Sequence, residues 1–318
     1  MTSPETTSAW TGPSFTHGPN EGSLNAKIWQ LPEGATLRLA PGIYEGSIAL
    51  PRSIRIISEK IGSVTLVGNK SATVSVEGAS KIELNRLVLR GSRRGHGATL
   101  QQYDGGRTTL NQCVLTKGQG RGLGGGAVDI QSGLMTLTRC RLTDHSAPQG
   151  GAVRVSGVAR VDLRHCVVSQ VKATGQGGGA LMVHGGAHLE AVGCTFDQCS
   201  GQTGSVGLVD GGAQGNATLW LRACIVAAGV SDAPFSVRGQ ARVDIRSCVL
   251  PRKIVESSGP IVCEDVIIRA LELEMTEGHP YSVKFPSLVK DLGQNVLGED
   301  PVDIYGRSRD RLWVGAVA

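Results

Sequence analysis

A short apolar unit containing one cysteine recurs along most of the chain, and this repeat constrains the fold more than any other feature. Most copies read Leu-x-x-Cys followed by two or three further residues, mostly apolar, and an earlier copy carries leucine in place of cysteine. Successive key residues are 24 to 30 positions apart: Leu87, Cys113, Cys140, Cys166, Cys194, Cys224 and Cys248. A steady period of this length is typical of proteins in which each copy stacks on the next.

A second marker keeps the same period. Two glycines followed by Ala and then Val or Leu occupy residues 125–128, 150–153 and 178–181. After each marker, apolar and polar residues alternate, so Val128 and Ile130 can point one way while Asp129 points the other. Alternation with period two predicts short strands, and the runs are too short and too often broken by glycine for helices.

Strands that cannot bury a face alone must stack, which predicts a parallel β-solenoid whose coils pair about 4.8 Å apart. Leucine-rich repeats are excluded because their asparagine and helical portions are absent, and propeller blades need four antiparallel strands in about 40 residues. We therefore expect an all-β fold: a single-stranded parallel β-helix of about nine coils of about 27 residues. Many of the 45 glycines are then assigned to tight turns between strands.

The repeat units resemble those of right-handed parallel β-helix proteins of the pectate-lyase-like superfamily. Residues 31–44 are similar to the opening of that superfamily, a short apolar strand before Pro-Gly-x-Tyr, and residues 303–309 with 315–316 look like the terminal motif of many bacterial β-helix surface proteins. The resemblance spans roughly residues 31–318 and implies a right-handed coil. It does not select an activity, because the superfamily includes lyases, hydrolases, esterases, adhesins and non-catalytic scaffolds.

The composition along the chain predicts three regions. Residues 1–20 are expected to form a flexible polar tail, and residues 21–31 a short amphipathic helix that caps the first coil. The capping helix and the coils together occupy residues 21–270. Residues 271–318, where the repeat fades and three prolines occur, are expected to form an irregular C-terminal cap.

The strands that follow the Gly-Gly pairs align in two columns that are expected to point outward. The first column contains Asp129, Arg154, Met182, Leu208 and Ser236. The second contains Gln131, Ser156, His184, Asp210 and Arg238, with Glu77 and Gln102 in earlier coils. Stacking would place neighbours of one column about 4.8 Å apart on an exposed face.

In the enzymes that the chain resembles, this face holds the substrate groove. The candidate catalytic residues are His184, Asp210 and Arg238: an acid that orients an imidazole, and an arginine for an anionic group. The candidate binding face comprises Asp129, Gln131, Arg154, Met182 and Leu208, of which the two apolar residues indicate a contact surface. A solenoid of this length must also expose polar residues in every coil, so a merely solvated face remains an alternative.

The carboxylates of this face do not form a catalytic pair. Asp129 and Asp210 are three coils apart, or about 14 Å, whereas the two carboxylates of a glycoside hydrolase lie about 5 to 9.5 Å apart. A calcium-dependent lyase needs several converging carboxylates, although Asp144, His145 and Asp197, expected in turns, could contribute.

The leading hypothesis is a non-catalytic binding or scaffold module for a protein partner or an acidic polysaccharide. The alternatives are a polysaccharide lyase or glycoside hydrolase acting on an acidic glycan, and a surface adhesin or appendage component.

The residues before each cysteine form another outward column with alternating charge. Four positions before the cysteine site come Glu83, Thr109, Thr136, Asp162, Glu190, Trp220 and Asp244. With basic residues beside them, these predict a ladder of exposed ion pairs, each of small energy, and Trp220 predicts a local contact site. The cysteines include no Cys-x-x-Cys pair, which favours a buried stack over a metal site, and no cofactor is expected.

Charge and hydropathy exclude two classes of partner. The net charge is only +5, so the chain lacks the dense basic surface of a nucleic-acid binder. It has 12 aromatic residues in all, which are few for a surface that stacks on bases. The sequence contains no run of about 18 apolar residues, so no membrane-inserted helix is expected. The N-terminus lacks the pattern of a signal peptide, so the expected location is cytoplasmic, with non-classical export as an alternative. The oligomeric state is not indicated.

Overall fold

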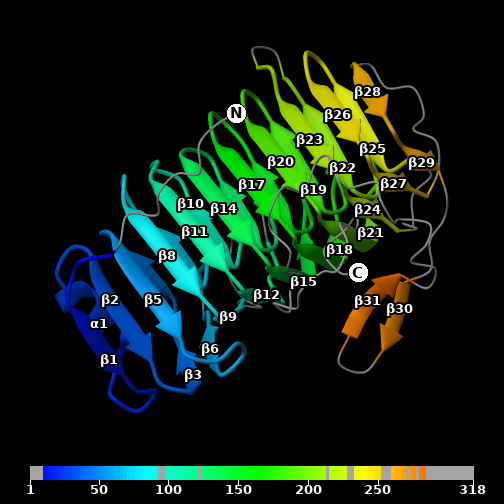
Figure 1. Cartoon of the computed structure of the whole chain (residues 1–318). Helices are drawn as coiled ribbons and strands as arrows, with labels where there is room; N and C mark the ends of the chain where they lie inside the picture. Colours follow the sequence, from blue (N-terminus) through cyan, green and yellow to red (C-terminus); the bar gives the residue numbers. More distant parts are fainter. Residues whose placement is uncertain are drawn as a thin grey trace.

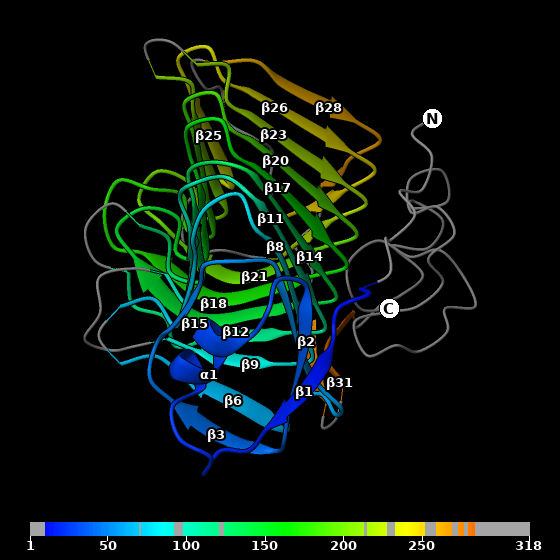
Figure 2. The ribbon, with the colours of Figure 1, turned by 90° about the vertical axis from the view of Figure 1, so that its left-hand side faces the viewer.

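The chain winds into a β-solenoid in which three long parallel sheets run side by side along the molecule (Figure 1). The computed structural model describes residues 10–69, 71–91, 98–120, 124–212, 215–227, 233–251 and 259–268, together with two strands between residues 273 and 283. From β2 to β27 each turn adds one strand to each sheet in a constant order. The sheets form three sides of the coil when viewed from the N-terminal end (Figure 2).

We name the sheets A, B and C in the order in which a turn visits them. Sheet A contains β1 (Ser14–His17), β2 (Ala35–Leu39), β5 (Ile54–Ser58), β8 (Lys81–Asn85), β11 (Arg107–Asn111), β14 (Leu134–Thr138), β17 (Arg160–Arg164), β20 (His188–Val192), β23 (Thr218–Arg222), β26 (Arg242–Arg246) and β28 (Ile261–Glu264). Sheet B contains β3 (Gly42–Glu45), β6 (Val64–Val67), β9 (Val88–Arg90), β12 (Val114–Thr116), β15 (Arg141–Ala147), β18 (Val167–Ala173), β21 (Thr195–Ser200), β24 (Ile225–Val226), β27 (Val249–Leu250) and β29 (Ile267–Ile268). Sheet C contains β4 (Ile48–Leu50), β7 (Val74–Val76), β10 (Leu100–Gln102), β13 (Val128–Ile130), β16 (Val153–Val155), β19 (Leu181–His184), β22 (Gly207–Asp210) and β25 (Phe235–Arg238).

This architecture confirms the predicted all-β parallel solenoid. The structure has about eight turns with a repeat near 26 residues, slightly fewer and shorter than the nine coils of about 27 residues expected from the sequence. Every pairing within sheets A, B and C is parallel, as the short repeat requires, because each coil can only place its strand beside the same strand of the next coil.

The cysteine column lies inside the solenoid, as predicted. The side chains of this column are fully buried in the shared core, and they are Leu87, Cys113, Cys140, Cys166, Cys194, Cys224 and Cys248. The sulfur atoms are in contact from coil to coil, and the backbone N–H of Cys166 donates to Sγ of Cys194 at 3.4 Å. Burial raises the pKa of the Cys140 thiol well above its usual value. All eight cysteines are free thiols, and Cys263 alone is exposed.

A single residue in the left-handed region turns the chain from sheet A into sheet B just before each cysteine position. Its φ values lie between 51° and 60°, although most of the residues there carry a side chain: Arg86, Gln112, Arg139, His165, Gly193, Ala223, Ser247 and Asp265. The N–H of each of these residues from Arg86 to Ser247 donates to a carbonyl of the following coil. This ladder of turns stacks in the same way as the strands and offsets part of the cost of the conformation.

The repeated Gly-Gly pairs are explained by close approach of neighbouring coils. A Cβ atom at Gly126 would lie 2.2 Å from the carbonyl oxygen of Gly151, and one at Gly151 would lie 2.1 Å from that of Gly179. At Gly179 it would meet the carbonyl oxygen of Ser205 at 1.9 Å. The second glycine of each pair is therefore required by lack of space, since none of these three residues has a positive φ.

A short helix covers the first coil. α1 (Leu24–Gln30) begins after Ser23, whose hydroxyl accepts a hydrogen bond from a backbone N–H of the first turn, as N-cap residues commonly do. Leu24 and Ile28 on one face are buried in the core. The helix lies within the range predicted from the sequence, residues 21–31, and performs the predicted capping role.

The segment before the helix belongs to the solenoid. β1 pairs in parallel with β2, so residues 14–17 extend sheet A by one strand. The expectation of a flexible tail over residues 1–20 is therefore wrong for this stretch. Trp10, further upstream, donates its indole N–H to Glu83 and lies under the ammonium group of Lys81, so it is held against the outer face of sheet A. Residues 1–9 lie outside the described residues.

The predicted C-terminal cap, residues 271–318, lies mostly outside the described residues. Within it, β30 (Leu273–Thr276) and β31 (His279–Val283) form an antiparallel pair separate from the three parallel sheets. In the described ranges, no helix is long and apolar enough to cross a membrane.

Candidate functional site

The two residue columns predicted for sheet C align in the structure. Asp129 lies beside Arg154, and the register continues through Met182 and Leu208 to Ser236. In the second column, His184 lies beside Asp210, which lies beside Arg238. For these residues the sequence identified correctly which side chains are neighbours along the solenoid axis.

The expected exposure of the first column is wrong. Asp129, Met182 and Leu208 have exposed fractions of 2%, 4% and 0%. The glycine turns that lead into sheet C run close against the backbone of the next coil: a Cβ at Gly178 would lie 2.2 Å from the backbone nitrogen of Leu208. Because both apolar side chains are buried, they cannot serve as an exposed contact surface.

The second column is more accessible but includes one misplaced residue. Gln131 and Arg238 are exposed, His184 and Asp210 are half-buried, and Ser156 is buried. Gln102 is wrong in this column, because β10 pairs it with Ile130, an inward position. Its buried amide accepts a hydrogen bond from the hydroxyl of Thr108 at 2.6 Å and donates to two backbone carbonyls.

The predicted catalytic residues are adjacent but do not form a connected hydrogen-bonded group in the described part of the chain. Asp210 Oδ1 accepts the backbone N–H of Gly212 at 2.8 Å, so this carboxylate stabilises the turn after β22. His184 Nδ1 is buried and has no hydrogen-bond partner among the described residues. Its ring lies against Gly212, at 3.4 Å from the position that a Cβ there would take. Arg238, on the next strand, is exposed.

A buried ionic cluster lies at the centre of sheet C. Arg154 Nη1 contacts Asp129 Oδ1 at 3.1 Å, and the hydroxyl of Tyr103 donates to Asp129 Oδ2 at 3.0 Å. Arg154 Nε also donates to the side chain of Gln149 at 3.3 Å. Burial raises the pKa of Asp129, while Arg154 and the Tyr103 hydroxyl oppose the rise. Burial and the nearby Asp129 raise the pKa of Tyr103. Both acceptor oxygens of Asp129 are thus committed to internal partners.

Replacing Arg154 with methionine should lower the free energy of unfolding by about 2 kcal/mol. Leaving a buried charge wholly unpaired costs about 3 to 5 kcal/mol, and the remaining Tyr103 hydrogen bond reduces this cost. Chemical denaturation would measure the loss. The double variant Asp129→Leu/Arg154→Met should recover most of it, and a double variant as unstable as the sum of the two single variants would contradict the pairing.

The predicted ladder of ion pairs is present on the outer face of sheet A. Arg160 contacts Asp162 at 3.0 Å and Glu190 at 3.3 Å, and Glu190 also contacts Arg222 at 3.6 Å. Trp220 stands in this ladder as predicted, with the Arg222 guanidinium 5.2 Å from its ring centroid and the His188 ring against it at 4.7 Å. The Trp220 ring thus contacts a residue of its own strand, Arg222, and a residue of the adjacent strand, His188.

His145, which the sequence places in a turn, lies in β15 and points into the solenoid. The side chain is 2% exposed. Nδ1 accepts the backbone N–H of Gly118 at 3.0 Å, so Nε2 carries the proton that is donated to the carbonyl of Leu115 at 2.9 Å. The imidazole therefore satisfies backbone groups of the preceding coil near the end of β12. Burial lowers its pKa to about 4.

The remaining acidic candidates do not assemble into a site. Asp144 is an exposed residue at a left-handed bend within β15, and Asp197 lies in β21, where burial raises the pKa of its carboxyl. In the ranges that the structure describes, no group of three His, Cys, Asp or Glu side chains is placed to hold a metal ion.

Comparison with known proteins gives no relative from which a site could be transferred. No protein-family model matches the chain, and no curated protein sequence matches it. The candidate site therefore rests on the geometry described above. The second column of sheet C exposes Gln131 and Arg238, whereas the first column holds the Asp129–Arg154 ion pair and the buried Met182 and Leu208.

Proposed function

We propose that the protein is a non-catalytic β-helix binding module of the pectate-lyase-like type, with a right-handed coil, and that it binds an acidic polysaccharide. The ligand would lie along the accessible column of sheet C, over Gln131, His184 and Arg238. These three residues lie on or directly after every second strand of sheet C. A regular row of polar side chains suits an extended polymer, because alternate coils can contact successive parts of the ligand.

The observation that carries this proposal is the commitment of Asp129 and Asp210 to structural partners. Asp129 is buried and bonded to Arg154 and Tyr103, and Asp210 accepts the Gly212 N–H. Two strands, β16 and β19, lie between these two residues, so at the strand spacing their carboxylates are about 14 Å apart. This distance exceeds the separation of about 5 to 9.5 Å between the two carboxylates of glycoside hydrolases. The burial of Met182 and Leu208 favours a polar ligand over a protein partner that needs an apolar contact surface.

Binding and turnover should be measured together on polygalacturonate and on other uronate polymers. We expect saturable binding by calorimetry with no new reducing ends and no unsaturated product. Arg238→Gln should weaken binding, whereas Arg90→Gln, the same change at an exposed position of sheet B, should not. Turnover that disappears in His184→Ala would replace this proposal with the enzyme alternative, and absence of binding to every polymer would overturn it.

A further inference from the structure

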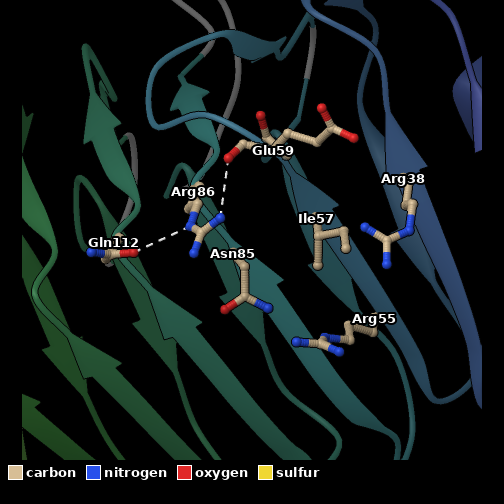
Figure 3. Close-up of a pocket in the computed structure, with 8 residues that line it drawn as sticks. Arg38, Arg55, Ile57, Glu59, Asn85, Arg86 and Gln112 are labelled. Atoms are coloured by element: carbon tan, nitrogen blue, oxygen red, sulfur yellow. Dashed lines mark hydrogen bonds between the residues drawn. The ribbon is translucent and has the colours of Figure 1, made fainter. Parts of the chain in front are cut away.

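A polar depression lies on the outer face of sheet A near the N-terminal end, away from the sheet C column. Its volume is about 250 Å³. The residues that line it are Arg38, Arg55, Ile57, Ser58, Glu59, Asn85, Arg86 and Gln112 (Figure 3). Three guanidinium groups in one small depression are a concentration of positive charge that neither the fold nor the proposed function requires.

The strand register explains how residues so far apart in sequence meet. Arg38 of β2 lies beside Ile57 of β5, which lies beside Asn85 of β8. Arg55 is two residues before Ile57 and therefore points to the same outer face, and Arg86 follows Asn85 at the left-handed turn. Ile57 consequently forms an apolar floor with guanidinium groups around it, as Figure 3 shows.

Two of the arginines are held in place by the protein. Arg86 donates from Nη1 to the backbone carbonyl of Glu59 at 3.1 Å and from Nε to Gln112 Oε1 at 3.3 Å. Arg55 contacts Glu83 at 3.0 Å. These contacts fix the direction of the guanidinium groups before a ligand arrives, which lowers the entropy lost on binding.

The depression carries an excess of positive charge. Arg38 has no ion-pair or hydrogen-bond partner among the described residues, and its side chain is exposed. In Figure 3 the side-chain carboxylate of Glu59 points away from Arg86, toward the side of the depression where Arg38 lies. Among the described residues, Arg55 alone of the three arginines is in an ion pair, with Glu83. Three guanidinium groups against the carboxylates of Glu59 and Glu83 leave a net positive charge for an anion.

We propose that this depression binds a tetrahedral oxyanion, the phosphate or sulfate group of a small ligand, with Arg38 and Arg86 as the principal contacts. Guanidinium groups form paired hydrogen bonds with such oxygens. The Asn85 and Gln112 side chains line the same depression and can supply further hydrogen bonds. The site is independent of the sheet C column, so either proposal can fail alone.

The test is calorimetric titration of the full chain with inorganic phosphate and with sulfate, at constant ionic strength maintained with chloride. We expect saturable binding with a Kd of about 1 mM, and a loss of at least about tenfold in Arg38→Gln/Arg86→Gln. The matched control is Arg164→Gln, because Arg164 occupies the same outer column as Arg38, five strands beyond β2. This control should bind as tightly as the unmodified protein.

Two further arms complete the experiment. Ile57→Glu places a carboxylate on the floor without removing an arginine and should abolish binding as well, which covers the case in which the double variant fails to fold. Glucose 6-phosphate tests whether the phosphate group belongs to a sugar. Tighter binding of glucose 6-phosphate than of inorganic phosphate would indicate a sugar-borne group, and equal or weaker binding would indicate a free anion. Equal losses in the Arg164 control, or unchanged binding in both Arg38→Gln/Arg86→Gln and Ile57→Glu, would overturn the proposal.

Discussion

Replacing Gly151 with alanine should lower the free energy of unfolding by about 4 kcal/mol or more, at the extreme of what single substitutions cause. The added Cβ would lie 2.1 Å from the carbonyl oxygen of Gly179 and 2.7 Å from the backbone of Lys172. Both neighbours are main-chain atoms of the next coil, and their hydrogen bonds to the coils on either side prevent them from moving independently. Urea denaturation followed by circular dichroism would measure the loss.

The matched control for this experiment is Gly186→Ala. Gly186 is exposed, and a Cβ there would approach only the carbonyl oxygen of Gly157, at 3.2 Å. We expect a change of less than about 1 kcal/mol, typical of a surface substitution. Similar denaturation midpoints for the two variants would show that the coils do not pack as closely as described.

The second large effect is a loss of stability in acid caused by His145. Burial lowers the pKa of this imidazole to about 4 from an unperturbed value of 6.5. Between pH 4 and 6.5, therefore, His145 is protonated in the unfolded chain and neutral in the folded chain. The contribution is fully present above pH 6.5 and is lost as the pH falls towards 4. A shift of this size corresponds to about 3 kcal/mol.

Thermal or urea unfolding of the unmodified protein and of His145→Leu across this pH range would isolate the contribution. The leucine variant should be less stable at pH 7, because the Gly118 N–H and the Leu115 carbonyl lose their partner. Its stability should change less between pH 6.5 and 4, so the two curves should converge in acid. Parallel curves would contradict a buried neutral imidazole.

The periodic part of the structure could be predicted from the sequence. The cysteine and Gly-Gly markers gave the coil length, the inward column and the neighbours along sheet C, because stacking forces equivalent residues into register. The alternation of Asp162 and Glu190 with basic residues likewise predicted the ion pairs on sheet A. All of these features depend only on the repeat.

The features that the sequence did not predict arise where coils differ. Met182 and Leu208 are buried although they occupy outward positions of the alternation, and the glycine turns run close against the backbone of their strands. The path of a turn is not contained in the alternation of its flanking strands. Gln102 points inward because it pairs with the inward residues Val76 and Ile130, and His145 follows the left-handed bend at Asp144 and pairs with the inward Val171. The depression on sheet A combines Arg38 with the turn residue Arg86, 48 positions later in the chain, and no local pattern connects the two.

The N-terminal cap has a consequence for assembly. The outermost strand of sheet C, β4, could otherwise accept a strand from another molecule, because exposed edge strands promote aggregation. Here Oδ1 of Asn25, in α1, accepts the N–H of Ala49 at 2.9 Å, so a side chain occupies the place of a missing strand. At its first strand the hydrogen-bond ladder of sheet C thus ends on a side chain of the cap. The Asn25 amide and the helix that carries it therefore disfavour the addition of a further strand to this end of sheet C.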